Sequence, residues 1–184
     1  MSNSRQIQNI ALIGFMGTGK SSVGQVLAHQ LGFTFLDTDQ LIETSEGRTI
    51  SRIFEEDGEP SFRALEAGIT RNLEHLRHHV ISTGGGLPVN PDNLASLKSH
   101  ALVVCLWASP EKIWERVRHQ AHRPLLHDPD PLGRIRTLLS AREPAYRLAD
   151  VLINTELRSV KEVVQQVMHH YSMAHPEHSW NRET

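Results

Sequence analysis

Short apolar stretches rich in β-branched residues alternate along the chain with longer stretches of helical period. The first pattern predicts buried strands and the second predicts amphipathic helices. Leu65, Ile69 and Leu73, for example, recur every four residues and so lie on one helix face. The strands are predicted at residues 9–14, 33–37, 79–83, 101–108 and 150–154, and the helices at 20–31, 60–77, 110–120, 131–148 and 160–171.

Alternation of strands with helices indicates a parallel sheet that helices cover on both faces. Ligands of such sheets bind beyond the carboxyl ends of the strands. Two stretches interrupt the alternation: residues 39–62, with two short helical patterns broken at Gly47 and Asp57-Gly58, and residues 121–131, a polar connector with three prolines. Both are long enough to form flaps over a site. The polar, aperiodic tail at 172–184 is predicted to be frayed.

The composition fits one globular domain over residues 1–184, with 39% hydrophobic and 22% charged residues. A net charge of −2 provides no basic field for nucleic acid or anionic lipid. The longest apolar run, residues 101–108, is far shorter than the roughly 20 residues of a membrane span, and residues 1–9 are too polar for a signal peptide. The single cysteine, Cys105, lies in that run and requires no oxidising compartment. We therefore expect a cytoplasmic protein without nucleic-acid or membrane partners.

Residues 14–21 read GFMGTGKS and match the phosphate-binding pattern G-x-x-x-x-G-K-S in full, between a predicted strand and a predicted helix. Glycines let successive backbone N–H groups surround phosphate oxygens, and the helix that begins near Lys20 adds its positive dipole end. Lys20 is expected to reach the β and γ phosphates, and the Ser21 hydroxyl to ligate Mg²⁺. A turn without a ligand would need neither side chain, so the sequence predicts a nucleoside triphosphate site.

The second predicted strand ends in Asp37-Thr38-Asp39, and the residue types allow two interpretations. On an extended chain the two carboxylates point the same way, so one could hold hydrated Mg²⁺ while the other meets a substrate hydroxyl. The same residues suit a helix N-cap followed by an acidic first turn. Spacing alone does not choose between the two.

The third predicted strand ends in three glycines, Gly84, Gly85 and Gly86, which would let the backbone approach a ligand closely. Taken alone, this run is also an ordinary loop. Basic residues stand at Arg63, Arg123 and Arg147, and a solvated surface position is the default for each arginine by itself.

Taken together, these segments resemble the shikimate kinases over residues 9–171. The resemblance depends on the order and spacing of six segments, each weak alone: GFMGTGKSSVG (14–24), LDTD (36–39), GEPSFRALE (58–66), STGGG (82–86), RPLL (123–126) and REPAYRLAD (142–150).

The resemblance implies a role for each matching residue. On the donor side it implies one Mg²⁺ held by Ser21 and Asp37, Arg123 on a lid over the phosphates, and Arg116 against adenine. The implied ATP-binding set is Gly17, Thr18, Gly19, Lys20, Ser21, Ser22, Arg116 and Arg123. On the acceptor side it implies that Asp39 binds the reacting hydroxyl as base, that Arg63 and Arg147 hold the shikimate carboxylate, and that Glu66 orients its neighbours. Gly84, Gly85 and Gly86 would line the substrate, and the implied catalytic residues are Lys20, Asp39 and Arg123.

The implied fold is a three-layer α/β sandwich of the nucleoside monophosphate kinase type. Its five parallel strands would run in the order 2-3-1-4-5, with a substrate-binding segment at about 39–66 and a lid at about 119–131. The implied enzyme is a monomer that uses ATP to phosphorylate shikimate at an alcohol group, in the synthesis of aromatic amino acids. The stretch Asn154-Thr155 resembles the adenine loop of the family, but Asn154 stands where the family commonly has aspartate. Two other functions compete on this fold: a gluconate or nucleotide kinase, and an inactive nucleotide-binding regulator.

Overall fold

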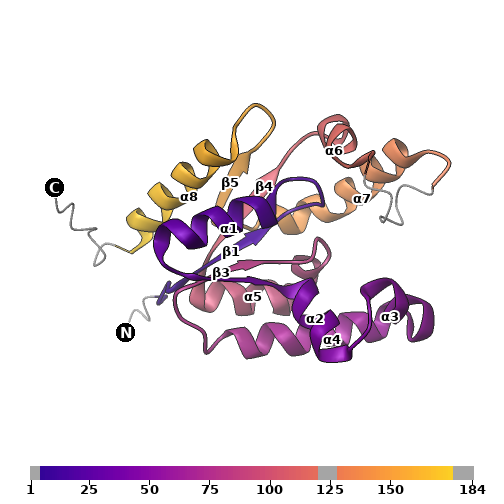
Figure 1. The fold of residues 1–184 in the computed structure, drawn as a ribbon, viewed down its shortest axis with the longest axis horizontal. Helices are drawn as coiled ribbons and strands as arrows, with labels where there is room; N and C mark the ends of the chain where they lie inside the picture. Colours follow the sequence, from indigo (N-terminus) through magenta and orange to yellow (C-terminus); the bar gives the residue numbers. More distant parts are fainter. Residues whose placement is uncertain (1–4, 120–127, 176–184) are drawn as a thin grey trace.

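The computed structural model describes residues 5–119 and 128–175, and in this part of the chain five parallel strands form a single sheet (Figure 1). The strands lie in the order β2-β3-β1-β4-β5, which confirms the predicted fold class. Their bounds are β1 Asn9–Ile13, β2 Thr34–Asp37, β3 His79–Ser82, β4 Ala101–Trp107 and β5 Val151–Asn154.

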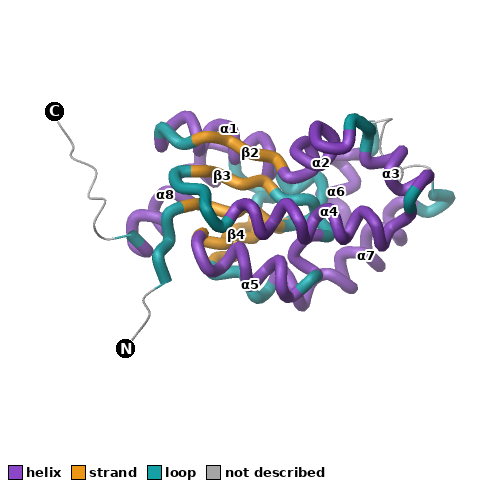
Figure 2. Tube along the Cα trace, turned by 90° about the horizontal axis from the view of Figure 1, so that it is seen from below, coloured by secondary structure: helices purple, strands orange, loops and turns teal. Residues whose placement is uncertain are grey.

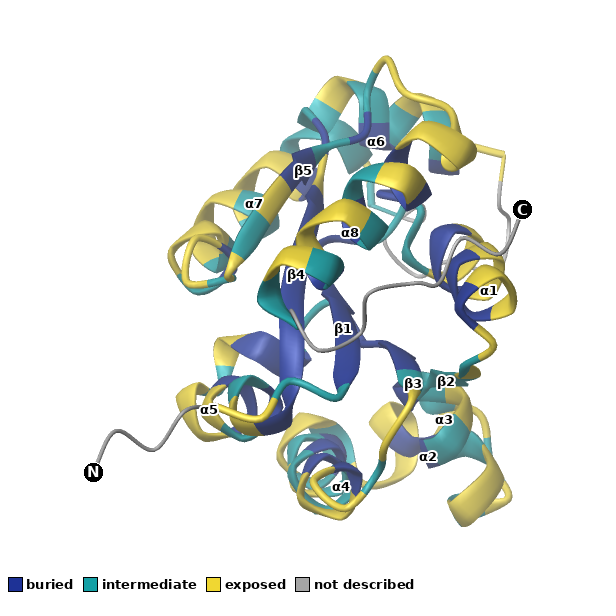
Figure 3. Cartoon of the chain, turned by 90° about the vertical axis from the view of Figure 1, so that its left-hand side faces the viewer, coloured by how far each residue is buried: buried dark blue, intermediate teal, exposed yellow. Residues whose placement is uncertain are grey.

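The central strands are buried on both faces, as the unbroken apolar runs of a parallel sheet require. Alternate residues of β1 and β4 enter two separate hydrophobic clusters because successive side chains of a strand point to opposite faces. Ala11 and Val103 belong to one cluster, and Ile10 and Val104 belong to the other. Figure 3 shows these buried strands between helices whose outer faces are exposed.

Helices cover both faces of the sheet, so the molecule has three layers (Figures 1 and 2). One cluster is closed by α1 (Lys20–Leu31) and α8 (Val160–Ala174). The other is closed by residues of α4 (Gly58–Leu73), α5 (Pro91–His100), α6 (Pro110–Val117) and α7 (Pro131–Tyr146).

The segment between β2 and α4 forms two short helices, α2 (Thr38–Glu46) and α3 (Ile50–Glu56). They end where the sequence predicted breaks: Gly47 and Gly58 both take positive φ angles, 64° and 79°. Ile42, Ile53 and Phe62 form a small cluster of their own here, apart from the two large clusters. The segment therefore has a small apolar cluster of its own, and Leu41 and Ile69 connect it to one of the large clusters.

Several element boundaries differ from the predicted ones. Helix α4 ends at Leu73 instead of residue 77, because the chain turns at residues 74–75. Before β3 begins, His78 takes a positive φ of 57°. Helix α5 and the short 3₁₀-helix η1 (Leu87–Val89) were not predicted. Helix α8 continues to Ala174, three residues into the tail that was predicted to be frayed.

Most of the predicted lid, including Arg123, lies outside the described residues. No helix in the described part of the chain is both long and apolar enough to cross a membrane.

Candidate active site

The phosphate-binding loop connects β1 to α1 in the predicted arrangement. Gly14 has a φ of 133°, and a Cβ atom there would collide with the Leu106 carbonyl of β4. The N-cap of α1 is Gly19, and no side chain caps the helix. The first N–H groups of α1 therefore point toward the loop with the helix dipole behind them, which is the arrangement that binds a phosphate.

Lys20, the first residue of α1, folds its ammonium group back over this loop. Its Nζ donates to the carbonyl oxygens of Gly14 at 2.8 Å and Phe15 at 3.0 Å. The positive charge is thus held at the mouth of the loop, within the cavity that the loop lines.

The structure confirms the N-cap interpretation of the Asp37–Asp39 segment and leaves the second oxygen of Asp37 facing the phosphate loop. Asp37 is the N-cap of α2, and its Oδ1 accepts from the Asp39 N–H at 3.0 Å. Its Oδ2 accepts from the Ser21 hydroxyl at 3.2 Å. Asp39 does not lie on the strand: it is in the first turn of α2, so the two carboxylates approach one another through the turn and not along an extended chain.

Asp39 is ionisable and mostly buried. Among the described residues, its Oδ1 atom is buried without a hydrogen-bond partner. Burial, and then the nearby charge of Asp37, raise the pKa of Asp39 to about 6, while Lys20 acts in the opposite direction. A carboxylate in this state is a good acceptor for a hydroxyl that a ligand brings in.

The glycine triplet after β3 is surrounded by side chains that a Cβ atom at each position would crowd. A Cβ on Gly84 would lie 2.5 Å from Asp39 Oδ1 and 3.2 Å from Glu66 Oε1. A Cβ on Gly85 would lie 3.2 Å from an Arg142 nitrogen, and one on Gly86 would lie 2.5 Å from an Arg63 nitrogen. Two carboxylates and two guanidinium groups therefore converge on one short stretch of backbone.

Hydrogen bonds from two helices hold this stretch in place. The Gly84 N–H donates to the hydroxyl of Thr38, the first residue of α2, at 3.0 Å. The hydroxyl of Tyr146, the last residue of α7, donates to the Gly85 carbonyl at 2.7 Å. The glycine loop is thus attached to the helix that carries Asp39 and to the helix that carries Arg142.

Glu66 is buried between the two arginines. Its side chain is 1% exposed and accepts from Arg63 at 2.7 Å, while its other oxygen has no partner among the described residues. Burial raises the pKa of Glu66 against the opposing effects of Arg63 and Arg142. Glu66 therefore orients Arg63 from within the protein, in the way that the sequence resemblance implied, and leaves one oxygen facing Gly84.

The structure brings Arg142 to the site and does not bring Arg147. The Arg147 side chain is 70% exposed, pairs with Glu143 at 2.5 Å and does not line the cavity. Arg142 does line it, and its guanidinium lies 5.4 Å from the centroid of the Phe15 ring. Arg142 lies in α7 and Arg147 is the C-cap of that helix, five residues later. The two side chains therefore point in different directions, and Arg142 is the one that lines the cavity.

These parts line one cavity of about 590 Å³ at the carboxyl ends of the strands. Of the predicted residues, the lining includes Gly17, Thr18, Gly19, Lys20, Ser21, Ser22, Asp37, Asp39, Gly85 and Arg116. Gly84, Gly86 and Arg63 are not in the lining. Gly84 and Gly86 flank the lining residue Gly85, and Arg63 lies against Gly86. The lining also contains Thr155, from the stretch that resembles the adenine loop, and residues that had no predicted role: Arg142, Ser82, Thr83 and Arg158.

Arg116 connects three segments around the cavity. From the last turn of α6 it donates to the Gly17 carbonyl at 3.1 Å and to the Thr155 hydroxyl at 3.0 Å. Thr155 follows β5, and its own N–H donates to the Trp107 carbonyl at 2.9 Å. Arg116 thus holds the phosphate loop against the segment after β5. Asn154 forms a turn here, with its Oδ1 accepting from the Glu156 N–H at 2.7 Å, which an aspartate could do equally.

The donor set beside the phosphate loop fits a magnesium ion. Mg²⁺ prefers oxygen ligands and usually binds one or two carboxylates together with waters and substrate phosphates. Ser21 Oγ and Asp37 Oδ2 are such oxygens, 3.2 Å apart. The described residues hold no group of three or more potential metal-ligating side chains. This is compatible with an ion that the nucleotide phosphates would help to bind.

Comparison with known families gives a match over most of the chain. The family model described as shikimate kinase matches residues 16–172. A shikimate kinase from Caldanaerobacter subterraneus subsp. tengcongensis is 43% identical over 165 residues, which are 90% of this chain and 96% of that protein.

Solved structures give a similar result. A shikimate kinase from Acinetobacter baumannii in complex with shikimate superposes with a TM-score of 0.84 at 37% identity, over 90% of this chain and 93% of that one. One from Aquifex aeolicus has a TM-score of 0.77 at 38% identity, over 88% and 94% of the two chains. A gluconokinase from Sinorhizobium meliloti is 20% identical with a TM-score of 0.61, over 94% and 97%, and this likeness is one of fold alone.

Proposed function

The chain belongs to the shikimate kinase family, and from that premise we propose that its cavity transfers the terminal phosphate of ATP to a hydroxyl group of shikimate. One observation carries the proposal beyond the family: a complete phosphate loop shares a cavity with Asp39, around a glycine loop that Arg63 and Arg142 approach. A phosphoryl donor site, a proton acceptor and a carboxylate-binding pair are what this reaction needs.

On the donor side, the backbone N–H groups of the loop and Lys20 would bind the phosphates. Lys20 would leave the Gly14 and Phe15 carbonyls and turn its ammonium toward the β and γ phosphates. Ser21 and Asp37 would hold Mg²⁺, which when bound offsets the negative charge on the phosphate oxygens. Arg116 keeps the loop in register with the segment after β5, where the nucleotide base would lie.

On the acceptor side, the unpartnered Oδ1 of Asp39 would accept a hydrogen bond from the reacting hydroxyl and later its proton. With a pKa of about 6, the carboxylate is mostly ionised at neutral pH. Its pKa is also nearer to the operating pH than that of an ordinary aspartate, which favours a general base. Arg63 and Arg142 would bind the substrate carboxylate, so we propose Arg142 for the role that the resemblance had assigned to Arg147.

Phosphoryl transfer has a loose transition state, so positioning and charge contribute most of the catalysis. Glycines at the acceptor loop permit the close approach, while Thr38 and Tyr146 fix the loop between α2 and α7. Lys20 supplies positive charge at the position where negative charge spreads over the transferring group. Arg123 would add a second charge from the lid, a role that falls outside the described residues.

We further propose that the enzyme acts as a monomer in the cytoplasm. All the side chains assembled around the cavity come from one chain, so a second copy is not needed to complete it. The single cysteine, Cys105, is buried in β4, and burial raises its pKa to about 12, which suits a structural thiol in a reducing compartment.

The test is a coupled ADP-release assay with ATP, Mg²⁺ and three acceptors in parallel: shikimate, gluconate and AMP. We expect turnover with shikimate alone and its loss in Lys20→Ala, which removes the charge aimed at the phosphates. Turnover with gluconate or AMP that exceeds turnover with shikimate would assign the chain a different acceptor. Absence of turnover in a folded protein that still binds ATP would indicate a regulator.

A further inference from the structure

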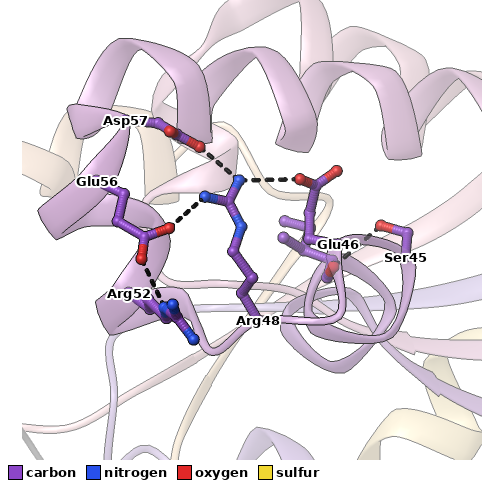
Figure 4. Close-up of polar contacts among 7 residues, drawn as sticks. Ser45, Glu46, Arg48, Arg52, Glu56 and Asp57 are labelled. Atoms are coloured by element: carbon purple, nitrogen blue, oxygen red, sulfur yellow. Dashed lines mark hydrogen bonds and ion pairs between the residues drawn. The ribbon is translucent and has the colours of Figure 1, made fainter.

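Arg48 lies at the centre of a four-residue ion cluster outside the cavity (Figure 4). It stands between α2 and α3, and its side chain is 24% exposed. Its guanidinium pairs with Glu46 at 3.1 Å, with Glu56 at 2.8 Å and with Asp57 at 2.5 Å. We call Arg48 and these three carboxylates the Arg48 cluster. A planar guanidinium with five N–H donors can serve three acceptors at once, which an ammonium group does less well.

The three carboxylates belong to the ends of three different helices. Glu46 is the last residue of α2, Glu56 is the last residue of α3, and Asp57 is the N-cap of α4. A negative charge at a helix C-terminus meets the negative end of the dipole and is unfavourable. Neither α2 nor α3 has a basic residue in its last turn. Arg48 therefore supplies the positive charge for both helix ends and holds them against the start of α4.

Two of these three helices, α2 and α4, carry the acceptor side of the site. Asp39 is in the first turn of α2, and Arg63 and Glu66 are in α4. Apart from the ion cluster, these helices are held together by a small apolar cluster of Ile42, Ile53 and Phe62, against which Ile50, Leu65 and Ile69 pack. With so little buried apolar area, the relative placement of α2 and α4 depends more on the ion cluster than it would in the main core.

We propose that Arg48 is a positioning residue for the acceptor substrate: it fixes α2, α3 and the start of α4 as one unit, and so keeps Asp39 in register with Arg63. This inference rests on the proposed function. Without Arg48, three carboxylates would face each other at two helix C-termini, and the segment would spend part of its time in arrangements that cannot bind the acceptor. Apparent affinity falls in proportion to the fraction that is binding-competent, while the phosphate loop, built on β1 and α1, is unaffected.

The experiment compares Arg48→Ala, Arg48→Lys and a matched control, Arg52→Ala. Arg52 is on α3, its side chain is 65% exposed, and it pairs with Glu56 at 2.6 Å, so the control removes one ion pair of the same segment without opening the cluster. We expect Arg48→Ala to raise the KM for shikimate about fivefold or more, with less than a twofold change in the KM for ATP. Arg48→Lys should fall between the wild type and Arg48→Ala, and Arg52→Ala should match the wild type.

Two readouts separate this proposal from a purely structural role and from failure of the proposed function. Calorimetry should show weaker shikimate binding in Arg48→Ala, and hydrogen exchange should be faster in α2 and α3 but not in α1. Equal KM changes for both substrates, or a shikimate KM that matches the wild type, would overturn the positioning role. If the wild type itself does not phosphorylate shikimate, the proposed function fails first, and the exchange measurement still decides whether Arg48 holds the segment. If Arg48→Ala does not fold, the same split in Arg48→Lys decides.

Discussion

Asp39 shows how a single residue can work against the stability of the fold that contains it. Burial and the charge of Asp37 raise its pKa to about 6, against 3.8 for an unperturbed aspartate. Because the folded pKa is above the unfolded one, the ionised side chain destabilises the fold above about pH 6. This penalty fades as the pH falls toward 4. Strain of this kind is common where a site is built to receive a ligand.

We therefore predict that Asp39→Asn makes the protein more stable and less active. Urea unfolding at pH 8 should show a gain of roughly 1–3 kcal/mol, which shrinks as the pH is lowered below 6. The kcat with shikimate should fall by about 10² or more, because the amide cannot take up the proton. If Asp39→Asn were less stable than the wild type at pH 8, the Asp39 carboxylate would have to form a stabilising interaction that the structure does not contain. A change in KM alone would make it only a binding residue.

Arg142, within α7, and Arg147, at the C-cap of the same helix, offer a direct comparison. Removing a charge-assisted hydrogen bond costs about 1.5–3 kcal/mol, so Arg142→Ala should weaken shikimate binding by roughly 10- to 150-fold. Arg147→Ala should leave it nearly unchanged, because its side chain is 70% exposed and pairs with Glu143 on the surface. Calorimetric titration with shikimate measures both, and ATP titration is the control. The reverse order of effects would restore the role implied for Arg147 by sequence resemblance.

Helical periodicity could have identified Arg142. Ile135 and Tyr146 are the buried residues of α7, and Arg142 is seven residues after the first and four before the second, on the same face. Arg147 is displaced from that face. The sequence motif identified the correct helix. Choosing the correct arginine within the motif required the helical period as well. The sequence also indicated Asp39 and Glu66. It could not show that each has a buried oxygen without a described partner, because contacts between distant segments bury these oxygens.

At the scale of elements, local sequence signals predicted those helices, strands and breaks whose positions depend on neighbouring residues. The phosphate loop, the breaks at Gly47 and Gly58, and the strand positions depend on neighbouring residues. Helix α5 was not predicted, although the sequence marks its start: Asn90 is its N-cap and Pro91 stands at its first position. The end of α4 was placed too late, because apolar spacing continues to Leu76 and the turn depends on Asn9 of β1, which accepts from His79 and donates to the Leu76 carbonyl.

The packing of α6 against the phosphate loop gives a prediction at this scale. Gly17 has a φ of 74°, and a Cβ there would lie 2.7 Å from a methyl group of Val117, the last residue of α6. The left-handed conformation alone costs about 1–2 kcal/mol for a residue with a Cβ, so Gly17→Ala should raise the KM for ATP roughly 5- to 30-fold. Adding Val117→Ala relieves the contact but not the backbone strain, and should recover only part of the loss. Full recovery in steady-state assays would mean that the backbone conformation is unimportant.

At the scale of the whole molecule, the two ends of the sheet have different tasks. The carboxyl ends of the strands hold the site, while the amino ends hold a buried polar group that joins segments far apart in sequence. Strand-helix alternation predicted the parallel sheet, but the order of its strands came from family resemblance. Pairing between β1 and β4 is a contact of distant segments that no local pattern specifies.

His100, at the amino end, is the centre of that polar group. Asn9 uses its oxygen to accept from the His79 N–H at 3.0 Å, so its amide nitrogen must be the donor to His100 Nδ1 at 2.9 Å. The ring therefore accepts at Nδ1 and is neutral. It is 5% exposed, and burial lowers its pKa, with Glu74 opposing and Arg77 and Arg5 adding to the effect.

We predict that His100 sets part of the acid sensitivity of the fold. A histidine with a lowered pKa contributes stability above pH 6.5, and this contribution is lost as the pH falls through its folded pKa, because the unfolded chain binds the proton more readily. His100→Gln keeps an acceptor for Asn9 and cannot titrate, so its unfolding free energy in urea should fall less than that of the wild type between pH 7 and pH 5. Asp39 titrates in both proteins and cancels in the comparison. His169→Gln, on the exposed face of α8, should follow the wild type. Because His100 is at the end of the sheet opposite the site, kcat at pH 7 should be the same in all three proteins. If the unfolding free energy of His100→Gln falls as much as that of the wild type between pH 7 and pH 5, the ring does not control this loss.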